Sequence, residues 1–273
     1  MDWHSSMAHD IVLSNVGFSY QNGRSVLESV SLSVFAGKVT ALMGGSGSGK
    51  STILRLISGL LKTDKGSVVV QGQNLATMTQ SQQREFRAKS GFMFQQGALF
   101  TDLSVFENVA FPIREHAPFL SEELIRSLVL MKLNAVGLRA VHGLMPSQLS
   151  GGMARRVALA RAISLDPRFI FYDEPFTGLD PVSLGVTAKL IRQLNDVLGA
   201  TSVIVSHDVQ ETFEIADYVY FLAEGKIVAS GTPQELVEST HPYVHQFIHA
   251  EKEGPVPFHA VGARPYLTDL GLS

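Results

Sequence analysis

The sequence contains no cysteine and no long apolar run. Without cysteine, disulfide frameworks, thiolate metal sites and cysteine nucleophiles are all excluded. No apolar stretch reaches the roughly 18 residues that a membrane-spanning helix requires, and residues 1–10 are polar, unlike a secretory signal. We therefore expect neither a membrane span nor a secreted precursor, and a cytoplasmic location.

Positive charge is also in short supply. The chain carries 22 Lys and Arg against 25 Asp and Glu, a net charge of −3. No global positive field would draw it onto nucleic acid or anionic lipid, so we expect no nucleic-acid partner. Its 273 residues, 45% hydrophobic and 17% charged, are enough for a sizeable core, which excludes disorder as the dominant state.

Two kinds of hydrophobic periodicity divide the chain. Residues 11–34 alternate as two antiparallel strands do, with a turn at Asn22–Gly23. Further on, short apolar runs alternate with helical patterns, which favours a central parallel sheet. The predicted strands there are 39–43, 92–94, 169–172, 201–206 and the hairpin 219–229, and the predicted helices are 51–60, 81–89, 182–198 and 209–216.

A mainly helical segment separates two of these strands. Residues 104–139 have helical periodicity, and Pro112 and Pro118 predict several helices because proline interrupts a helix. We expect one domain over residues 10–250, with a helical subdomain at about 104–165. Residues 251–273 form a tail whose apolar side chains indicate that it packs on the dimer or a partner.

A glycine-rich motif lies between the 39–43 strand and the helix that follows it. Residues 44–51 satisfy G-x-x-x-x-G-K-[ST], whose backbone N–H groups and helix N-terminus bind phosphate. Lys50 would reach the β- and γ-phosphates and Ser51 would ligate Mg²⁺. The candidate phosphate-binding residues are Gly44, Gly45, Ser46, Gly47, Ser48, Gly49, Lys50, Ser51 and Thr52. The alternative, a flexible glycine turn, leaves the lysine and the hydroxyl as coincidences.

Two acids end the apolar strand 169–172. Asp173 would lie at the carboxyl edge of the sheet, where the Mg²⁺ of a nucleotide binds. Glu174 faces the other way on the pleat and is the candidate general base for the attacking water. Acidic residues at strand ends are common, so this interpretation depends on the presence of Lys50 in the same chain.

A second glycine-rich segment at the start of a predicted helix resembles a motif of a known family. Residues 149–153, Leu-Ser-Gly-Gly-Met, resemble the LSGGQ signature of ABC-type ATPases, with Met153 in place of glutamine. In the family's order, Gln95 resembles the Q-loop glutamine, 177–180 the D-loop and His207 the switch histidine. Tyr20 is placed like the aromatic that stacks on adenine.

The resemblance implies a fold and a set of roles. The fold is α/β, a P-loop NTPase cassette with a RecA-like parallel-sheet core, an antiparallel β subdomain and a helical signature subdomain. Glu174, His207 and Lys50 would be catalytic, with Mg²⁺ at Ser51, Gln95 and Asp173. Beyond the phosphate loop, the residues implied to contact ATP are Tyr20, Gln95, Ser150, Gly151, Gly152 and Asp180.

The signature element implies a homodimer. In the family, the signature of one protomer closes over the ATP held by the other. Met153 removes a side-chain amide and leaves the backbone donors. Arg155, Arg156 and Arg161 follow on the same helix, where we expect them to pair with nearby acids rather than bind nucleic acid.

Three classes of ABC protein compete, and transport is favoured. A DNA-repair or chromosome ATPase would carry a coiled-coil or zinc insertion, and a translation factor two cassettes. The chain has one cassette, no heptad run and no cysteine. Within transporters, residues 94–102, 108–116, 145–148 and 254–258 resemble the ATPase subunit of Mla systems, which move phospholipid and maintain outer-membrane lipid asymmetry in Gram-negative bacteria.

The Mla resemblance also implies partners. They are an integral-membrane permease, a hexameric periplasmic lipid-binding ring of the MCE type and a small cytoplasmic STAS-domain protein. The ATPase would lie at the cytoplasmic face of the inner membrane, attached through the permease. The lipid substrate rests on the resemblance alone. The alternative is the ATPase of an ABC importer or exporter for another solute.

Overall fold

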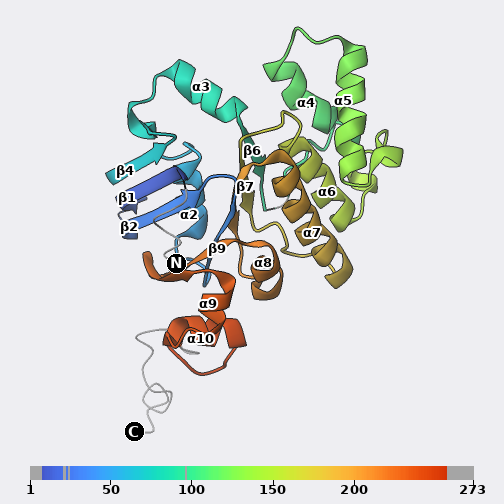
Figure 1. Cartoon of the computed structure of the whole chain (residues 1–273). Helices are drawn as coiled ribbons and strands as arrows, with labels where there is room; N and C mark the ends of the chain where they lie inside the picture. The colour runs from blue at the N-terminus through green and yellow to red at the C-terminus, as the bar shows by residue number, and fades with distance from the viewer. Residues whose placement is uncertain (1–7, 21–22, 24, 96, 257–273) are drawn as a thin grey trace, which may run out of the picture.

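The computed structural model describes residues 8–20, 23, 25–95 and 97–256. Asn22 of the predicted turn and tail residues 257–273 lie outside the described residues. The chain forms two β-sheets: one lies at the centre of the molecule among helices, and the other, with β1, β2 and β4, lies at one edge (Figure 1). Within the described part of the chain, no helix combines the length and apolar character needed to cross a membrane.

The smaller sheet is antiparallel and holds the N-terminal strands. Its order is β2-β1-β4-β5. Ile11 and Leu13 of β1 are buried and face the core, as their alternation predicts, and an irregularity in the pairing after Leu13 brings Val16 to the same core. The four strands are β1 (His9–Ser19), β2 (Ser25–Phe35), β4 (Lys65–Val70) and β5 (Gln73–Asn74).

The larger sheet is parallel except at one edge. Its order is β10-β9-β3-β8-β7-β6, and only β10 runs antiparallel to its neighbour. Every residue of β3 and β8 is buried, which explains why most of their side chains are apolar; the polar exceptions are Thr40, Thr201 and Ser202. The strands are β3 (Val39–Gly44), β6 (Ser90–Met93), β7 (Phe169–Asp173), β8 (Thr201–Val205), β9 (Tyr218–Ala223) and β10 (Lys226–Gly231). The carboxyl ends of β3, β7 and β8 therefore meet at one edge.

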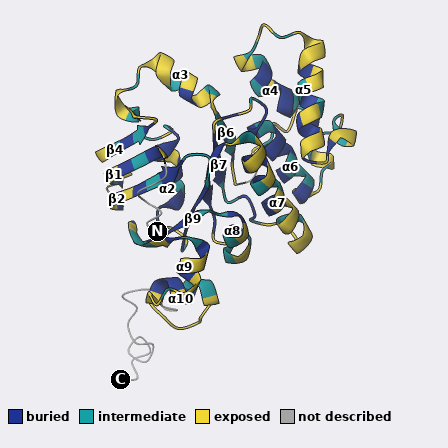
Figure 2. Ribbon diagram, viewed as in Figure 1, coloured by how far each residue is buried: buried dark blue, intermediate teal, exposed yellow. Residues whose placement is uncertain are grey.

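Helices cover both sides of the parallel sheet, with their apolar faces toward it (Figure 2). One core lies between the two sheets around α2, a second beneath α4 to α8, and a third beneath α9 and α10. The helices are α2 (Lys50–Ile57), α3 (Gln80–Ala88), α4 (Val105–His116), α5 (Glu122–Ala135), α6 (Gly151–Ala162), α7 (Pro181–Leu198), α8 (Val209–Ile215), α9 (Pro233–Val237) and α10 (Pro242–His249). Short 3₁₀ turns occupy Leu75–Thr77, Arg139–Val141 and Pro146–Gln148.

The prediction that Pro112 interrupts a helix is wrong, since α4 continues through it to His116. A proline inside a helix costs about 3 kcal/mol. Burial of Val109 and Ile113 in the second core, together with an N-cap at Ser104, offsets that cost. Pro118 does separate two helices, because α4 ends before it and α5 begins after it.

Asn108 organises the loop that precedes α4. The residue is fully buried, and its Nδ2 donates to the carbonyls of Phe100, Leu103 and Ser104. Its Oδ1 accepts from the Phe100 N–H at 2.8 Å. One side chain therefore fixes both polar groups of Phe100 and closes the loop.

Replacement of Asn108 by alanine should destabilise the fold by about 2–4 kcal/mol, because several buried backbone groups lose their only side-chain partner. Chemical denaturation of the full chain measures the change. Glu115→Ala, at an exposed position of the same helix, is the matched control and should change stability by less than about 0.5 kcal/mol. Equal effects of the two variants would contradict the organising role of Asn108.

Candidate functional site

The glycine-rich loop connects β3 to α2 in a conformation that requires glycine at both ends. Gly44 has φ 138°, and a Cβ there would lie 2.1 Å from the carbonyl oxygen of Leu222. Gly49 has φ 107°, and its Cβ would lie 2.6 Å from Leu27 Cδ2. Any other residue would push the loop away from β9 or from the antiparallel sheet. The motif thus folds as a tight turn that leads straight into the N-terminus of α2.

Lys50 is held at the base of this loop. Its ammonium group donates to the carbonyl oxygens of Gly44 at 2.8 Å and Gly45 at 2.9 Å. Burial lowers the pKa of Lys50, and the carboxylates of Glu174 and Asp173 oppose this shift. A buried cation at the end of the loop therefore lies near two acids at the carboxyl end of a different strand, β7.

The first pair of predicted ligands meets at the sheet edge. Ser51 Oγ donates to Asp173 Oδ1 at 2.9 Å, although the two residues are 122 positions apart. Tyr20 lies beside them on the loop side, with its hydroxyl 3.3 Å from Thr52 Oγ1 and its ring edge-on to Phe18. The structure thus brings together Tyr20, the glycine-rich loop and Asp173.

An open cavity of about 900 Å³ lies over the loop. Residues 45–52 form its floor, and Tyr20, Val26, Tyr243 and Val256 form part of its wall. The Ser48 hydroxyl is buried in this loop and has no hydrogen-bond partner within the part of the chain that the structure describes. The cavity is large enough for a nucleotide-sized ligand.

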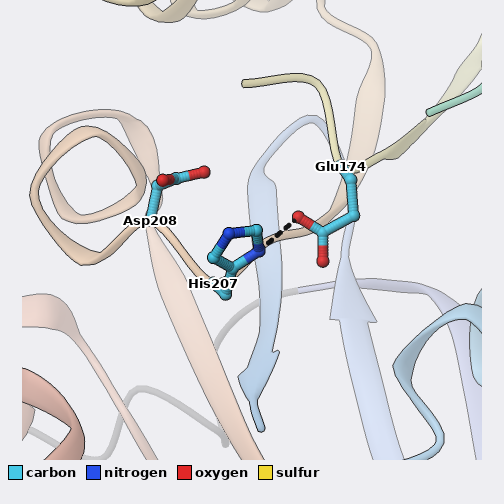
Figure 3. Close-up of side chains that lie close together, drawn as sticks. All are labelled: Glu174, His207 and Asp208. Atoms are coloured by element: carbon cyan, nitrogen blue, oxygen red, sulfur yellow. Dashed lines mark hydrogen bonds and ion pairs between the residues drawn. The ribbon is translucent and has the colours of Figure 1, made fainter. Parts of the chain in front are cut away.

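Glu174 and His207 form a second cluster next to Asp173 (Figure 3). His207 Nδ1 donates to Glu174 Oε2 at 2.8 Å, and Thr177 Oγ1 donates to the same oxygen at 3.3 Å. Asp208 lies on the other side of His207, and the three side chains place ligand atoms within 4.8 Å of one another. Glu174 Oε1 carries no hydrogen bond to any described residue, so this oxygen is available to a ligand.

The expected backbone position of Glu174 needs a correction. The sequence predicts that Glu174 faces the other way from Asp173 on the pleat. Strand β7 ends at Asp173, and Glu174 has a left-handed φ of 50°. The change of direction comes from this turn, which leads the side chain toward the end of β8 and His207.

The remaining predicted ligands lie away from the cavity. Gln95 is exposed beyond β6 and forms no hydrogen bond to Ser51 or Asp173 among the described side chains. Ser150 caps α6 by accepting from the Met153 N–H, and Asp180 caps α7. The described lining of the cavity includes none of Gln95, Ser150, Gly151, Gly152 and Asp180, and Asp173, Glu174 and His207 are also outside it.

Among the described residues, the arginines of α6 bond to backbone carbonyls and not to acids, so that expectation is wrong. Arg155 donates to the carbonyls of Phe94 and Thr177, and Arg161 to those of Gly97 and Ala98. A guanidinium has several donors in a fixed plane and can join two loops at once. Arg155 therefore ties the loop after β6 to the loop after β7. Arg156 bonds similarly to the Val136 carbonyl.

Comparison with known proteins places the chain in a family. A family model described as ABC transporter matches residues 27–177, more than half of the chain. The chain belongs to the ABC transporter family. It is 50% identical over 260 residues to the intermembrane phospholipid transport system ATP-binding protein MlaF of Haemophilus influenzae, covering 95% of this chain and 97% of that protein. MlaF of Escherichia coli K12 is 50% identical over 253 residues, 93% of each chain.

Solved cassettes share the fold. A dimeric post-hydrolysis state of the ATP-binding cassette MJ0796, bound to ADP and Pi, superposes with a TM-score of 0.75 at 31% identity, over 82% of this chain and 98% of that one. These likenesses confirm the predicted ABC cassette fold and the Mla-type resemblance. The chain is an ATP-binding ATPase of this family.

Sequence reasoning missed two residues near the site, Asp208 and Tyr243, and assigned the wrong partners to a third, Arg155. Asp208 directly follows His207, and that adjacency was a usable signal. Arg155 carried no signal, because its acceptors are backbone carbonyls from two distant loops. Tyr243 contacts the loop from 198 positions away, a separation that no local pattern predicts.

Proposed function

We propose that this chain is the ATP-hydrolysing subunit of an ABC transporter that moves phospholipids between the inner and outer membranes of a Gram-negative bacterium. The observation that supports the lipid substrate is the 50% identity to MlaF proteins over nearly the whole chain. The ATPase chemistry has separate support in the paired contacts Ser51–Asp173 and Glu174–His207.

We propose that the glycine-rich loop holds the phosphates of ATP. The backbone N–H groups of residues 46–51 and the N-terminus of α2 supply donors and a positive dipole end, whereas the Gly45 N–H donates to the Tyr243 hydroxyl. Lys50 supplies a positive charge. Its ammonium group donates to two loop carbonyls and could donate to a phosphate oxygen instead when ATP binds. Tyr20, at the cavity wall, would stack on the adenine.

The donor set at the sheet edge fits Mg²⁺. Ser51 and Asp173 offer hard oxygen atoms, which Mg²⁺ prefers, and Gln95 is the third proposed ligand. When bound with ATP, Mg²⁺ would neutralise phosphate charge and so favour attack by water. Lys50 and Mg²⁺ together would offset the repulsion between ATP and the two acids.

Glu174 is the proposed general base. Its Oε2 is occupied by His207 and Thr177, whereas Oε1 is available to accept a proton from the attacking water. The bond from His207 Nδ1 fixes the carboxylate and leaves the other imidazole nitrogen for the water or the γ-phosphate. The two side chains therefore act as one unit.

We propose that the active form is a homodimer. Ser150, Gly151 and Gly152 start a second helix with free N–H groups, but the described cavity of their own chain does not include them. A second copy would bring this element over the ATP, and Asp180 would contact the nucleotide across the same interface. Met153 packs its side chain on the core, which keeps the helix start in place without the usual amide.

The proposed assembly follows the Mla pattern. A permease would be moved by dimer closure, with an MCE-type periplasmic ring and a small STAS-domain protein as further partners. The chain would lie at the cytoplasmic face of the inner membrane. Residues 10–250 would form the ATPase domain, with 104–165 as its helical subdomain and 251–273 as a contact segment. The alternative remains an ABC transporter for another solute.

Purification of the tagged chain at native level from membranes tests the substrate. In mild detergent, mass spectrometry should identify a permease, a periplasmic lipid-binding subunit and bound phospholipid. Lys50→Ala, purified in parallel, is the control for assembly without nucleotide. Recovery of a different permease without lipid would overturn the lipid substrate and leave the ATPase chemistry in place.

Removal of residues 257–273 should weaken self-association or complex assembly. Several apolar residues lie in this segment, among them Phe258, Leu267 and Leu270, and burial of each stabilises a contact by about 1.5–3 kcal/mol. Sedimentation of the chain with ATP and of the assembled complex measures the effect. A full-length variant with Ser at these three positions is the control for length. An unchanged sedimentation profile in both variants would refute the contact role.

A further inference from the structure

Tyr243 connects the last helix of the described chain to the glycine-rich loop. Its hydroxyl accepts a hydrogen bond from the Gly45 N–H at 2.9 Å and donates one to the Leu222 carbonyl at 3.2 Å. The side chain is 9% exposed, and it forms part of the wall of the cavity over the loop. A single oxygen atom thus joins the loop to the end of β9.

The contact falls at the point where the chain leaves the sheet. Gly44 is the last residue of β3 and pairs with Leu222 of β9. Gly45 follows directly, and its carbonyl is one of the two acceptors that hold Lys50. Both backbone polar groups of Gly45 are therefore held. Its N–H donates to Tyr243, and its carbonyl accepts from the Lys50 ammonium group.

Helix α10 cannot readily move the hydroxyl away. Val244 is fully buried, and Phe247 packs edge-on against Phe221 of β9 with ring centroids 5.5 Å apart. On the same helix, Gln246 clamps the following segment, because its Oε1 accepts from the Val256 N–H at 2.8 Å and its Nε2 donates to the Val256 carbonyl at 3.2 Å. Helix, segment and loop form one packed unit beside the cavity.

We propose that Tyr243 is a positioning residue of the nucleotide site. It holds the start of the phosphate loop in the conformation that binds ATP. This inference rests on the proposed placement of the phosphates at residues 46–51. Without the hydroxyl, the Gly45 N–H and the Leu222 carbonyl each lose a partner. The loop is then less ordered before nucleotide binds, and the entropy lost on ordering it weakens nucleotide affinity. Glu174 and His207 follow the ends of β7 and β8 and bond to each other, not to Tyr243, so the chemical step keeps its geometry.

Tyr243→Phe in the full chain tests the role, because it removes one oxygen and keeps the ring. One hydrogen bond is worth about 0.5–1.5 kcal/mol, so we expect the Kd for ADP and the KM for ATP to rise about threefold to tenfold. The kcat at saturating ATP should stay within about twofold. Titration with ADP and steady-state ATP turnover measure both quantities.

Tyr220→Phe is the matched control. The Tyr220 hydroxyl also bridges a backbone N–H and a carbonyl, both of Ser33, but it lies away from the loop. It should lower thermal stability without a change in ADP affinity. Equal losses of ADP affinity in Tyr243→Phe and Tyr220→Phe, or a fall in kcat with unchanged KM, would overturn the positioning role.

Lys50→Ala separates this inference from the proposed function. If Lys50→Ala leaves ADP affinity unchanged, the phosphates do not bind at this loop and the placement itself fails. If Lys50→Ala weakens ADP binding while Tyr243→Phe binds as the wild type does, the phosphate site stands and only the role of Tyr243 is overturned.

Discussion

Replacement of Glu174 by glutamine is expected to lower the kcat for ATP hydrolysis at least about a hundredfold, the usual contribution of a general base. Glutamine keeps the size of the side chain and the acceptor for the Nδ1–H of His207, but its amide cannot take a proton from water. ATP binding should be retained, because the loop and Lys50 are untouched. The variant should therefore accumulate as an ATP-bound closed dimer, measurable by sedimentation.

Glu211→Gln is the matched control for the loss of one negative charge near the site. Glu211 lies in the first turn of α8, four positions after His207, and takes no part in the Glu174–His207 pair. Its ATP turnover should equal that of the wild type. Equal turnover by wild type and Glu174→Gln would instead remove Glu174 from the catalytic role, and a similar loss in both variants would assign the effect to charge alone.

The fold was predictable where the sequence pattern is local. The alternation over 11–34 specifies two strands and the apolar run at 39–43 a third, each through the burial of its side chains, and all three strands form. The helix through Pro112 was not predictable, because the cost of a proline is local and the packing that offsets it comes from α5 and α6. Local rules fail where tertiary contacts outweigh them.

The site divides in the same way. The glycine-rich loop and Lys50 were predictable because the motif is contiguous and its chemistry depends on backbone N–H groups. The pairing of Ser51 with Asp173 required the parallel order of β3, β8 and β7, which only the alternation of strands and helices suggested. Tyr243 and Arg155 act through backbone groups far away in sequence, so their residue types carry no signal.

Replacement of Lys50 by alanine is expected to weaken ATP binding at least about tenfold, because charge-assisted hydrogen bonds to phosphate contribute about 1.5–3 kcal/mol each. The loop keeps its glycine-determined turn and its hydrogen bond to Tyr243, so the substitution lowers ATP affinity and leaves the conformation of the loop unchanged. Titration of the full chain with ATP measures the affinity. Lys226→Ala is the control, since Lys226 is an exposed lysine paired with Glu28 near the same cavity, and it should bind ATP normally.

The stability of the Lys50→Ala protein gives a second, independent readout. Burial lowers the pKa of Lys50, so the charged form is less favourable in the folded state than in the unfolded chain. At pH values below the lowered pKa, this ammonium therefore costs folding free energy, and the cost diminishes as the pH rises through the lowered pKa. The nucleotide-free variant should melt at or above the Tm of the wild type, whereas the Tm increase on addition of ATP should be lost. A lower nucleotide-free Tm would mean that the bonds of Lys50 to Gly44 and Gly45 stabilise the fold by more than burial of the charge costs.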